Sequence, residues 1–160
     1  RAVAVFFAHS SDSWFWWIAM AILWSLGNSF WKEWAVIQFV GIGGLAALVM
    51  GIKFTVRRSR PEGEWGSIYR NTDPHSFPSG HAARSFFIAV VAAWFGPAWL
   101  AILLWLWAPL VALARVAMGV HYVSDIVAGA VVGVIVALVG LQIYEPIFMS
   151  LFRYIDFPLW

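Results

Sequence analysis

Five long apolar runs dominate the pattern of the chain, at about residues 14–31, 34–52, 78–95, 97–117 and 122–144. Each has roughly 17 to 25 residues, enough for an α-helix to cross a hydrocarbon layer about 30 Å thick. The interruptions between neighbouring runs are short, and we place turns at Lys32 and Glu33, at Gly96 and Pro97, and at Met118, Gly119 and Val120. The predicted fold class is all-α: a polytopic membrane helix bundle of about five transmembrane helices.

The composition supports a membrane protein. Hydrophobic residues make up 62% of the 160 residues and charged residues only 11%, which is more apolar surface than a small soluble core hides from water. Twelve tryptophans are typical of anchors at the boundary between hydrocarbon and water. The absence of cysteine excludes disulfides and thiolate-bound zinc. No repeat or linker divides the chain, so we expect residues 1–160 to form a single membrane-embedded domain.

One long polar stretch interrupts the apolar pattern, between Phe54 and Phe77. Pro61 and Pro74 prevent a continuous helix there, so the stretch predicts a loop outside the membrane. The tail after Pro146 and the first dozen residues mix aromatic and charged positions, which is typical of segments that lie in the interface. The chain begins with Arg rather than Met and shows no signal-peptide pattern, so we expect a processed or trimmed start.

Each crossing reverses the membrane face on which the chain emerges, and this places the ends of four runs together. The second run ends at Lys53, the third begins near Ser79, the fourth ends near Arg115, and the fifth begins near His121. Eight of the ten basic residues lie on or near that face. The positive-inside rule would make the face cytoplasmic, but basic residues that bind phosphate produce the same bias, so the side stays open.

Cationic side chains on this face are suited to bind a phosphate. Lys53, Arg60 and Arg115 supply positive charge, and arginine donates paired hydrogen bonds to phosphate oxygens. Ser79 and Gly80 begin the third run, where unpaired backbone N–H groups and the helix dipole favour an anion. The alternative is a set of interfacial cations that reach lipid headgroups.

Two histidines on the same face predict acid, base and nucleophile chemistry. His121 and Asp125 lie four residues apart on one helix face, so the carboxylate can hold the imidazole and leave its other nitrogen as a nucleophile toward phosphorus. His81, from another helix, would act as a general acid and then as a general base. The alternative for either histidine alone is a hydrogen-bonded packing residue.

We assign no catalytic role to the remaining polar residues and glycines. Arg84 either faces the site or pairs with Asp73 or Glu64. His75 either lines the entrance of the site or is a surface residue of the loop, and we favour the surface position. We expect His9, Asp12 and Glu145 to be interfacial charges. Five glycines are interpreted as positions of close helix contact: Gly41, Gly43, Gly44, Gly129 and Gly133. The motifs of nucleotide-binding loops and of metalloproteases are absent.

Three motifs together resemble the superfamily of type 2 phosphatidic acid phosphatases and vanadium-dependent haloperoxidases. Lysine, six residues and Arg-Pro match Lys53 to Pro61, and Pro-Ser-Gly-His matches Pro78 to His81. The third motif, Ser-Arg, five residues, His, three residues and Asp, matches from Arg115 through His121 to Asp125, with Ala114 in place of its serine. Each motif alone is weak, but their combination over residues 53–125 is specific.

The resemblance implies a reaction without metal or other cofactor. In it, His121 attacks phosphorus, Asp125 supports it, and His81 serves as acid and then base. The implied phosphate-binding residues are Lys53, Arg60, Ser79, Gly80 and Arg115. Membrane members usually have six spanning helices, so five runs imply a short form or a chain without its first helix; short forms resemble bacterial phosphatases of polyprenyl or glycerolipid phosphates.

We therefore expect a phosphatase of lipid phosphates or pyrophosphates in a bacterial inner membrane, whose partners are the lipid substrate and the bilayer. We expect no nucleic-acid partner, and protein partners stay open. A phosphotransferase of the same family, which passes the phosphate to another lipid or sugar, is the first alternative. A noncatalytic membrane subunit that binds phospholipid headgroups is the second. Halide oxidation is typical of larger, less apolar members and is disfavoured.

Overall fold

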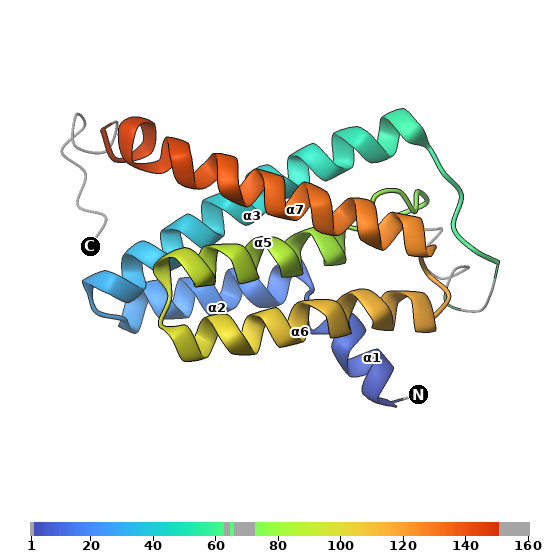
Figure 1. Cartoon of the computed structure of the whole chain (residues 1–160), viewed down its shortest axis with the longest axis horizontal. Helices are drawn as coiled ribbons and strands as arrows, with labels where there is room; N and C mark the ends of the chain where they lie inside the picture. Colours follow the sequence, from blue (N-terminus) through green and yellow to red (C-terminus); the bar gives the residue numbers. More distant parts are fainter. Residues whose placement is uncertain (1, 63–64, 66–72, 151–160) are drawn as a thin grey trace.

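The structure, a computed structural model, describes residues 2–62, 65 and 73–150. It is helical, and the only β pairing among these residues is an isolated bridge between Ser59 and His75. In chain order the elements are α1 (Ala2–His9), α2 (Ser13–Leu26), α3 (Ser29–Val56), α5 (Gly80–Phe95), α6 (Ala98–Ala117), α7 (Val123–Ile143) and the π-helical turn η1 (Tyr144–Met149) (Figure 1). The predicted all-α class is confirmed.

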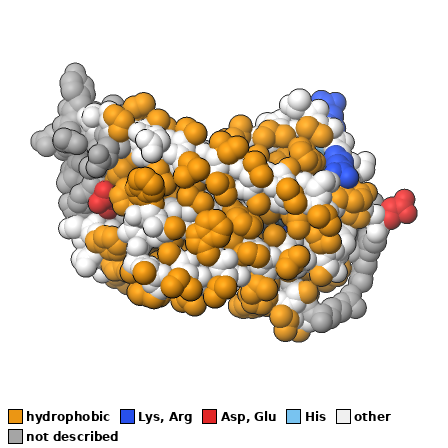
Figure 2. All heavy atoms as spheres, viewed as in Figure 1, with side chains coloured by type: hydrophobic (Ala, Val, Ile, Leu, Met, Phe, Trp, Pro, Cys, Tyr) orange, Lys and Arg blue, Asp and Glu red, His pale blue; other side chains and the backbone are white. Residues whose placement is uncertain are grey.

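All five predicted apolar runs are helices, but they differ in length. α3, α6 and α7 have 28, 20 and 21 residues and combine the length and hydropathy of membrane spans. α2 and α5 have 14 and 16 residues, or about 21 and 24 Å at 1.5 Å per residue, which is shorter than a hydrocarbon core of about 30 Å. The count of five spans therefore stays a prediction. Figure 2 shows hydrophobic side chains along the whole visible face of the bundle.

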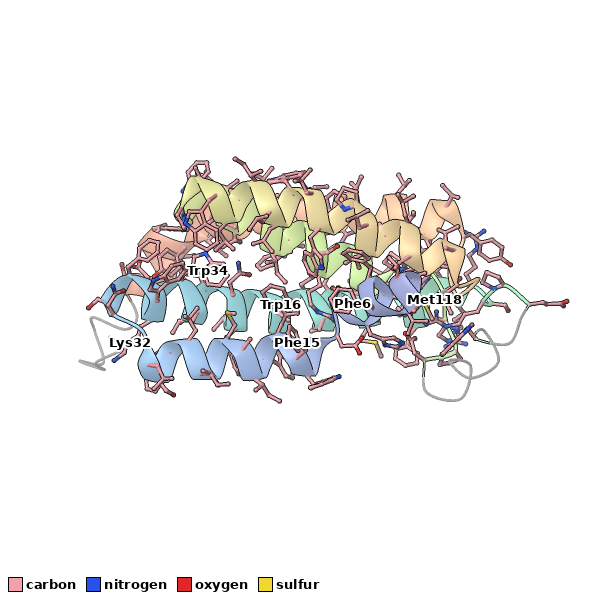
Figure 3. The ribbon with its side chains drawn as sticks, turned by 90° about the horizontal axis from the view of Figure 1, so that it is seen from below. Phe6, Phe15, Trp16, Lys32, Trp34 and Met118 are labelled. Atoms are coloured by element: carbon pink, nitrogen blue, oxygen red, sulfur yellow. The ribbon has the colours of Figure 1, made fainter. Side chains whose placement is uncertain are left out.

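The first predicted turn is in the wrong place. The chain turns at Gly27 and Asn28, where the Gly27 N–H donates to the Leu23 carbonyl (2.8 Å) and the Asn28 side chain accepts from the Trp31 N–H (3.2 Å). The helix starts after Asn28 and not after Lys32 and Glu33, because the asparagine side chain accepts a hydrogen bond from a backbone N–H that has no partner within the helix. Lys32 therefore lies inside α3, at the end of the bundle opposite Met118 (Figure 3).

The other two predicted turns are confirmed. Gly96 ends α5, and its N–H donates to the Ala92 carbonyl (2.8 Å). Gly119 follows α6 with φ of 66°, a left-handed conformation that glycine adopts without steric cost. The predicted interfacial tail lies outside the described residues beyond Ser150, as do Arg1, Glu64, Arg70, Arg153 and the side chain of Glu145.

α5 is the centre of the bundle. Its residues from Ala82 to Ala92 are buried, apart from partly exposed Phe86, and the helix packs against α3, α6 and α7. α2 packs on α3, and the short α1 packs on the end of α6, where Ala8 is buried against Met118 (Figures 1 and 3). Because α5 begins with the Pro-Ser-Gly-His motif, its central position brings that motif between the neighbouring helices.

Three of the five glycines lie at close helix contacts, as predicted. A Cβ on Gly129 would lie 2.4 Å from the Ser79 carbonyl oxygen, and one on Gly133 would lie 2.0 Å from the Ala83 carbonyl oxygen. A Cβ on Gly41 would lie 2.2 Å from the ring of Phe87. The prediction is wrong for Gly43 and Gly44, whose Cβ positions meet nothing within 4 Å. The small residues of α7 therefore bring its backbone against α5.

This contact predicts the effect of adding one methyl group. Gly133→Ala should destabilise the protein by about 1–3 kcal/mol, because the new Cβ collides with backbone and the two helices must separate. The control is Gly140→Ala on the same helix, where a Cβ meets nothing within 4 Å. Thermal unfolding in detergent measures both variants. Equal unfolding temperatures for the two variants would show that α5 and α7 do not pack this closely.

Candidate active site

The predicted site residues meet at the end of the bundle where α3 and α6 end and α5 and α7 begin (Figure 1). A cavity of about 610 Å³ opens there. Its polar lining consists of Lys53, Asp73, His81, Arg84 and His121, together with Ser13 and the backbone of Gly80. Segments 108 residues apart in the chain, from Ser13 to His121, thus share one cavity, and the meeting of Lys53, His81 and His121 agrees with the predicted alternation of membrane faces.

Lys53 and Arg60 point at one anionic group, the carboxylate of Asp73. Lys53 Nζ donates to Asp73 Oδ2 and to the His75 carbonyl (2.9 Å). Arg60 donates from Nη2 to the same Oδ2 (2.8 Å) and from Nε to the Asp73 carbonyl (2.7 Å). Both cations are buried, each 3% exposed. The Asp73 carboxylate therefore occupies the position on which the two cations converge.

Arg115 and Ser79 are fully buried and do not line the cavity themselves, whereas Gly80 and His81 at the start of α5 do. Arg115 is completely buried at the end of α6, and its Nη1 lies 3.5 Å from the Ala8 carbonyl. Ser79 is the N-cap of α5, and its side chain accepts from the Ala82 N–H (3.4 Å). The Ser79 N–H donates to the Asp125 carbonyl (2.9 Å), which ties the start of α5 to α7. Gly80 lines the cavity beside them.

His121 lies before the first turn of α7 with its two ring nitrogens in different surroundings. Nδ1 is 3.5 Å from Asp125 Oδ2, an ion-pair distance longer than a normal hydrogen bond. Nε2 is 3.3 Å from Arg60 Nη1. Burial lowers the pKa of His121 to about 4, and the charges of Arg115, Arg60 and Lys53 contribute against the opposing effect of Asp125. At neutral pH the imidazole is therefore uncharged, the form in which a ring nitrogen is nucleophilic.

Asp125 is held by a residue that the sequence did not single out, Arg58. Arg58 Nη1 donates to Asp125 Oδ1 (2.9 Å) and to the Ser124 hydroxyl (2.6 Å), and the guanidinium lies over the Tyr122 ring at 4.1 Å. The Tyr122 N–H donates to Asp125 Oδ2 (2.9 Å). These contacts fix the carboxylate that faces His121. Arg58 follows the exposed Arg57 in the sequence, and only the folded structure shows that Arg58 is the arginine that binds Asp125.

His81 also has a carboxylate partner, and it comes from an unexpected place. His81 Nε2 lies 2.7 Å from Asp12 Oδ1, in the link between α1 and α2. Burial raises the pKa of Asp12, but the hydrogen bonds and charges of His81 and His9 outweigh it and lower the pKa to about 2. The interpretation of Asp12 as an interfacial charge is therefore wrong, because its side chain turns inward to a histidine. No sequence motif connects positions 12 and 81.

The remaining polar residues differ from the predictions in part. Arg84 lines the cavity, as one alternative held, but it donates to the Ser11 carbonyl rather than to Asp73. His75 packs its ring edge-on against Phe54 (5.7 Å), which fits a loop residue. Among residues 2–62, 65 and 73–150, no cluster of three or more His, Asp or Glu side chains is arranged to hold a metal ion.

Fold and site together define a class of helical membrane proteins that carry, at one end of the bundle, a cavity lined by cations and histidines. The model of the PAP2 superfamily matches residues 34–148, and the chain belongs to this family. Its fold is similar to that of the transmembrane PAP2-type phosphatidylglycerolphosphate phosphatase of Bacillus subtilis, with a TM-score of 0.73, 22% identity, and 91% of this chain and 77% of the other covered. It is also similar to Aquifex aeolicus LpxE, with a TM-score of 0.70, 25% identity, and 87% and 83% covered.

Curated relatives match shorter parts of their own length. A probable lipid phosphate phosphatase beta of Arabidopsis thaliana is 32% identical over 120 residues, 57% of this chain and 56% of the relative. The lipid A 4'-phosphatase of Bacteroides thetaiotaomicron is 45% identical over 58 residues, 36% of this chain and 26% of the relative. This chain thus spans about half the length of these relatives or less. With its apolar helices and these structural neighbours, it is an integral membrane protein.

The position of Asp73 predicts a competition with inorganic phosphate. Asp73→Asn should tighten the Kd for phosphate roughly 10-fold, equal to about 1.4 kcal/mol, because the negative charge that Lys53 and Arg60 bind is removed. Calorimetric titration of the detergent-solubilised protein measures the Kd. The matched control is Glu62→Gln, which removes an exposed carboxylate of the same loop. Unchanged or weaker phosphate binding in D73N would show that these cations are not the phosphate site.

Proposed function

We propose that the chain is a membrane phosphatase that hydrolyses a lipid phosphate, as a monoester or pyrophosphate, through a phosphohistidine on His121. One observation carries the proposal: a single cavity has a polar end formed by cations and histidines and an apolar wall formed by α3. A phosphate group fits the polar end, and an alkyl chain fits the apolar wall. The lipid phosphatases named among the relatives support the same substrate class.

The polar end supports a two-step reaction. Arg60 and Lys53 transfer their hydrogen bonds from Asp73 to the phosphate, with Arg115 and the N-terminus of α5 adding positive charge. His121 Nε2 then attacks phosphorus, the bond from phosphorus to the lipid oxygen breaks, and that oxygen receives a proton from His81. In the second step water attacks the phosphohistidine, His81 accepts a proton from the water, and His121 is released with inorganic phosphate.

Apolar residues on one side of α3 form the wall of the cavity below the cations. They are Ile42, Leu45, Ala46, Val49 and Met50, and Trp14 of α2 stands opposite. Residues of α2 and α3 thus line one cavity, and an alkyl chain can lie along the α3 side of it. A water-soluble phosphate ester makes no use of such a wall, so the cavity favours a substrate that stays in the membrane.

We propose that the reaction needs no metal or other cofactor, because the cations and the α5 N-terminus already supply positive charge around the phosphate. We also propose a bacterial inner membrane as the location, on the basis of bacterial relatives and the short helical form. The lipid A phosphatases differ in which phosphate of their substrate they are named for, so the relatives leave the particular lipid open.

His121→Ala should lower kcat for phosphate release from a long-chain lipid phosphate by roughly 10³-fold or more, because the nucleophile is lost. The matched control is His75→Ala, a loop histidine whose ring contacts Phe54 and whose removal should leave the rate near that of the unsubstituted protein. The assay contains EDTA and follows inorganic phosphate, and ³²P-labelled substrate traps an acid-labile phosphoenzyme. Turnover retained by H121A, or abolished by EDTA, would contradict the mechanism.

The apolar wall predicts a chain-length effect. Ala46→Trp should lower kcat/KM for long-chain lipid phosphates about 10-fold and leave short-chain phosphates nearly unaffected, because the indole fills the wall and not the polar end. Ala47→Trp is the control, because Ala47 is the next residue of the same helix and faces outward. Equal losses on long and short substrates in A46W would show that the tail does not lie along α3.

A further inference from the structure

The link between α1 and α2, Ser10–Asp12, is fastened to the central helices. The Ser11 hydroxyl donates to the His81 carbonyl (3.2 Å), and Arg84 donates to the Ser11 carbonyl. Trp107 of α6 donates from Nε1 to the Ser10 hydroxyl (2.8 Å). Ser11 is completely buried. A connection between two helices that is held by both α5 and α6 presents its last residue, Asp12, in a fixed position.

Asp12 stands at the N-cap position of α2 but does not cap the helix. An aspartate there normally accepts a hydrogen bond from a backbone N–H of the first turn, which stabilises the helix. The side chain of Asp12 makes no such bond and instead places Oδ1 2.7 Å from His81 Nε2 and Oδ2 3.2 Å from His9 Nδ1. The Asp12 carboxylate thus contacts His81, 69 residues away, and makes no capping hydrogen bond to α2.

Building on the proposed function, we propose that Asp12 is the positioning residue of the general acid. It holds Nε2 of His81, so that Nδ1 is the nitrogen left for the cavity, and it stabilises the imidazolium. Burial of His81 disfavours a positive charge on its ring, and the charges of Arg115 on α6 and Arg84 on α5 act in the same direction, so a protonated His81 depends on the negative charge of Asp12. The site then contains two His–Asp pairs, His121 with Asp125 and His81 with Asp12.

The proton follows a simple path in this arrangement. His81 begins as an imidazolium, with Nε2–H donating to Asp12 and a second proton on Nδ1. As the bond from phosphorus to the lipid oxygen breaks, the Nδ1 proton passes to that oxygen and leaves a neutral ring. Nδ1 then accepts a proton from the attacking water while the bond from phosphorus to His121 breaks. Asp12 keeps the same hydrogen bond throughout and exchanges no proton.

Asp12 lies outside the part of the chain that matches the PAP2 superfamily model, which begins at residue 34. The nucleophile, its carboxylate and the phosphate-binding cations all lie inside that part. The acid of the reaction therefore takes its support from a segment that precedes the family core. This separates Asp12 from the residues that the three motifs assign.

The test compares substrates whose leaving groups differ in their need for a proton. Asp12→Asn should lower kcat/KM for an alkyl phosphate roughly 10- to 100-fold, a part of the 10²–10⁴ that a general acid contributes. For p-nitrophenyl phosphate, whose leaving group departs without protonation, the loss should be less than about 3-fold. Because kcat/KM ends at formation of the phosphohistidine, the later water step does not enter the comparison.

The matched control is Glu33→Gln, the same change of carboxylate to amide at the opposite end of the bundle, where Glu33 accepts from the Tyr144 hydroxyl (2.9 Å). It should leave the ratio of the two kcat/KM values unchanged. Equal losses on both substrates in D12N would overturn the inference and assign Asp12 a purely structural role. Full activity of D12N on the alkyl phosphate would overturn it as well.

A second measurement does not depend on turnover. Nitrogen-15 NMR of histidine-labelled protein at neutral pH should show His81 with its proton on Nε2, and D12N should lose this preference. A neutral His81 ring with its single proton on Nδ1 in the unsubstituted protein would overturn the inference even where D12N does not fold. Failure of the proposed function appears differently, as a protein that hydrolyses neither substrate and forms no phosphoenzyme while the NMR result for His81 still holds.

Discussion

Positive charge buried at the end of an apolar bundle is the constraint on which the structure depends. Lys53, Arg60 and Arg115 are almost fully shielded from water, and a charge in such a place is costly without a partner. The fold meets this cost with carbonyl oxygens of the loops, with the carboxylate of Asp73, and with hydrogen bonds to neighbouring elements. An arrangement that must hold an anion in order to be stable is also one that is prepared to bind a phosphate.

The rest of the fold brings the chain to that point. α5 begins inside the site, and it reaches this depth because small residues let α7 lie against it, with Gly129 and Gly133 touching the backbone of its first turns. The hydrogen bond from the Ser79 N–H to the Asp125 carbonyl then couples the start of α5 to α7, whose Asp125 faces His121. The residues that pack α5 against α7 thus lie beside the polar residues of the site, and the motifs occur where these helices begin.

The sequence predicted the helices and the central side chains well, because both depend on local pattern. Apolar runs of fixed length identify helices, and the alternation of membrane faces brings His81 and His121 to one end. Sequence-based prediction failed where a single contact determines the position of a turn or the partner of a side chain. The asparagine cap at Asn28 moved a turn away from two charges, and Asp12 and Arg58 find their partners 69 and 67 residues away. The catalytic roles themselves stay predictions until turnover is measured.

One feature of α3 links the two ends of the proposed substrate. The helix carries the apolar wall from Ile42 to Met50 and, one turn further, Lys53. Eleven residues separate Ile42 from Lys53, a rise of about 16 Å along one rigid rod. A lipid held along it has no freedom to sink or rise in the membrane without separating its phosphate from the lysine. Under the proposed function, α3 would select lipids by the distance between their phosphate and the hydrocarbon of the membrane.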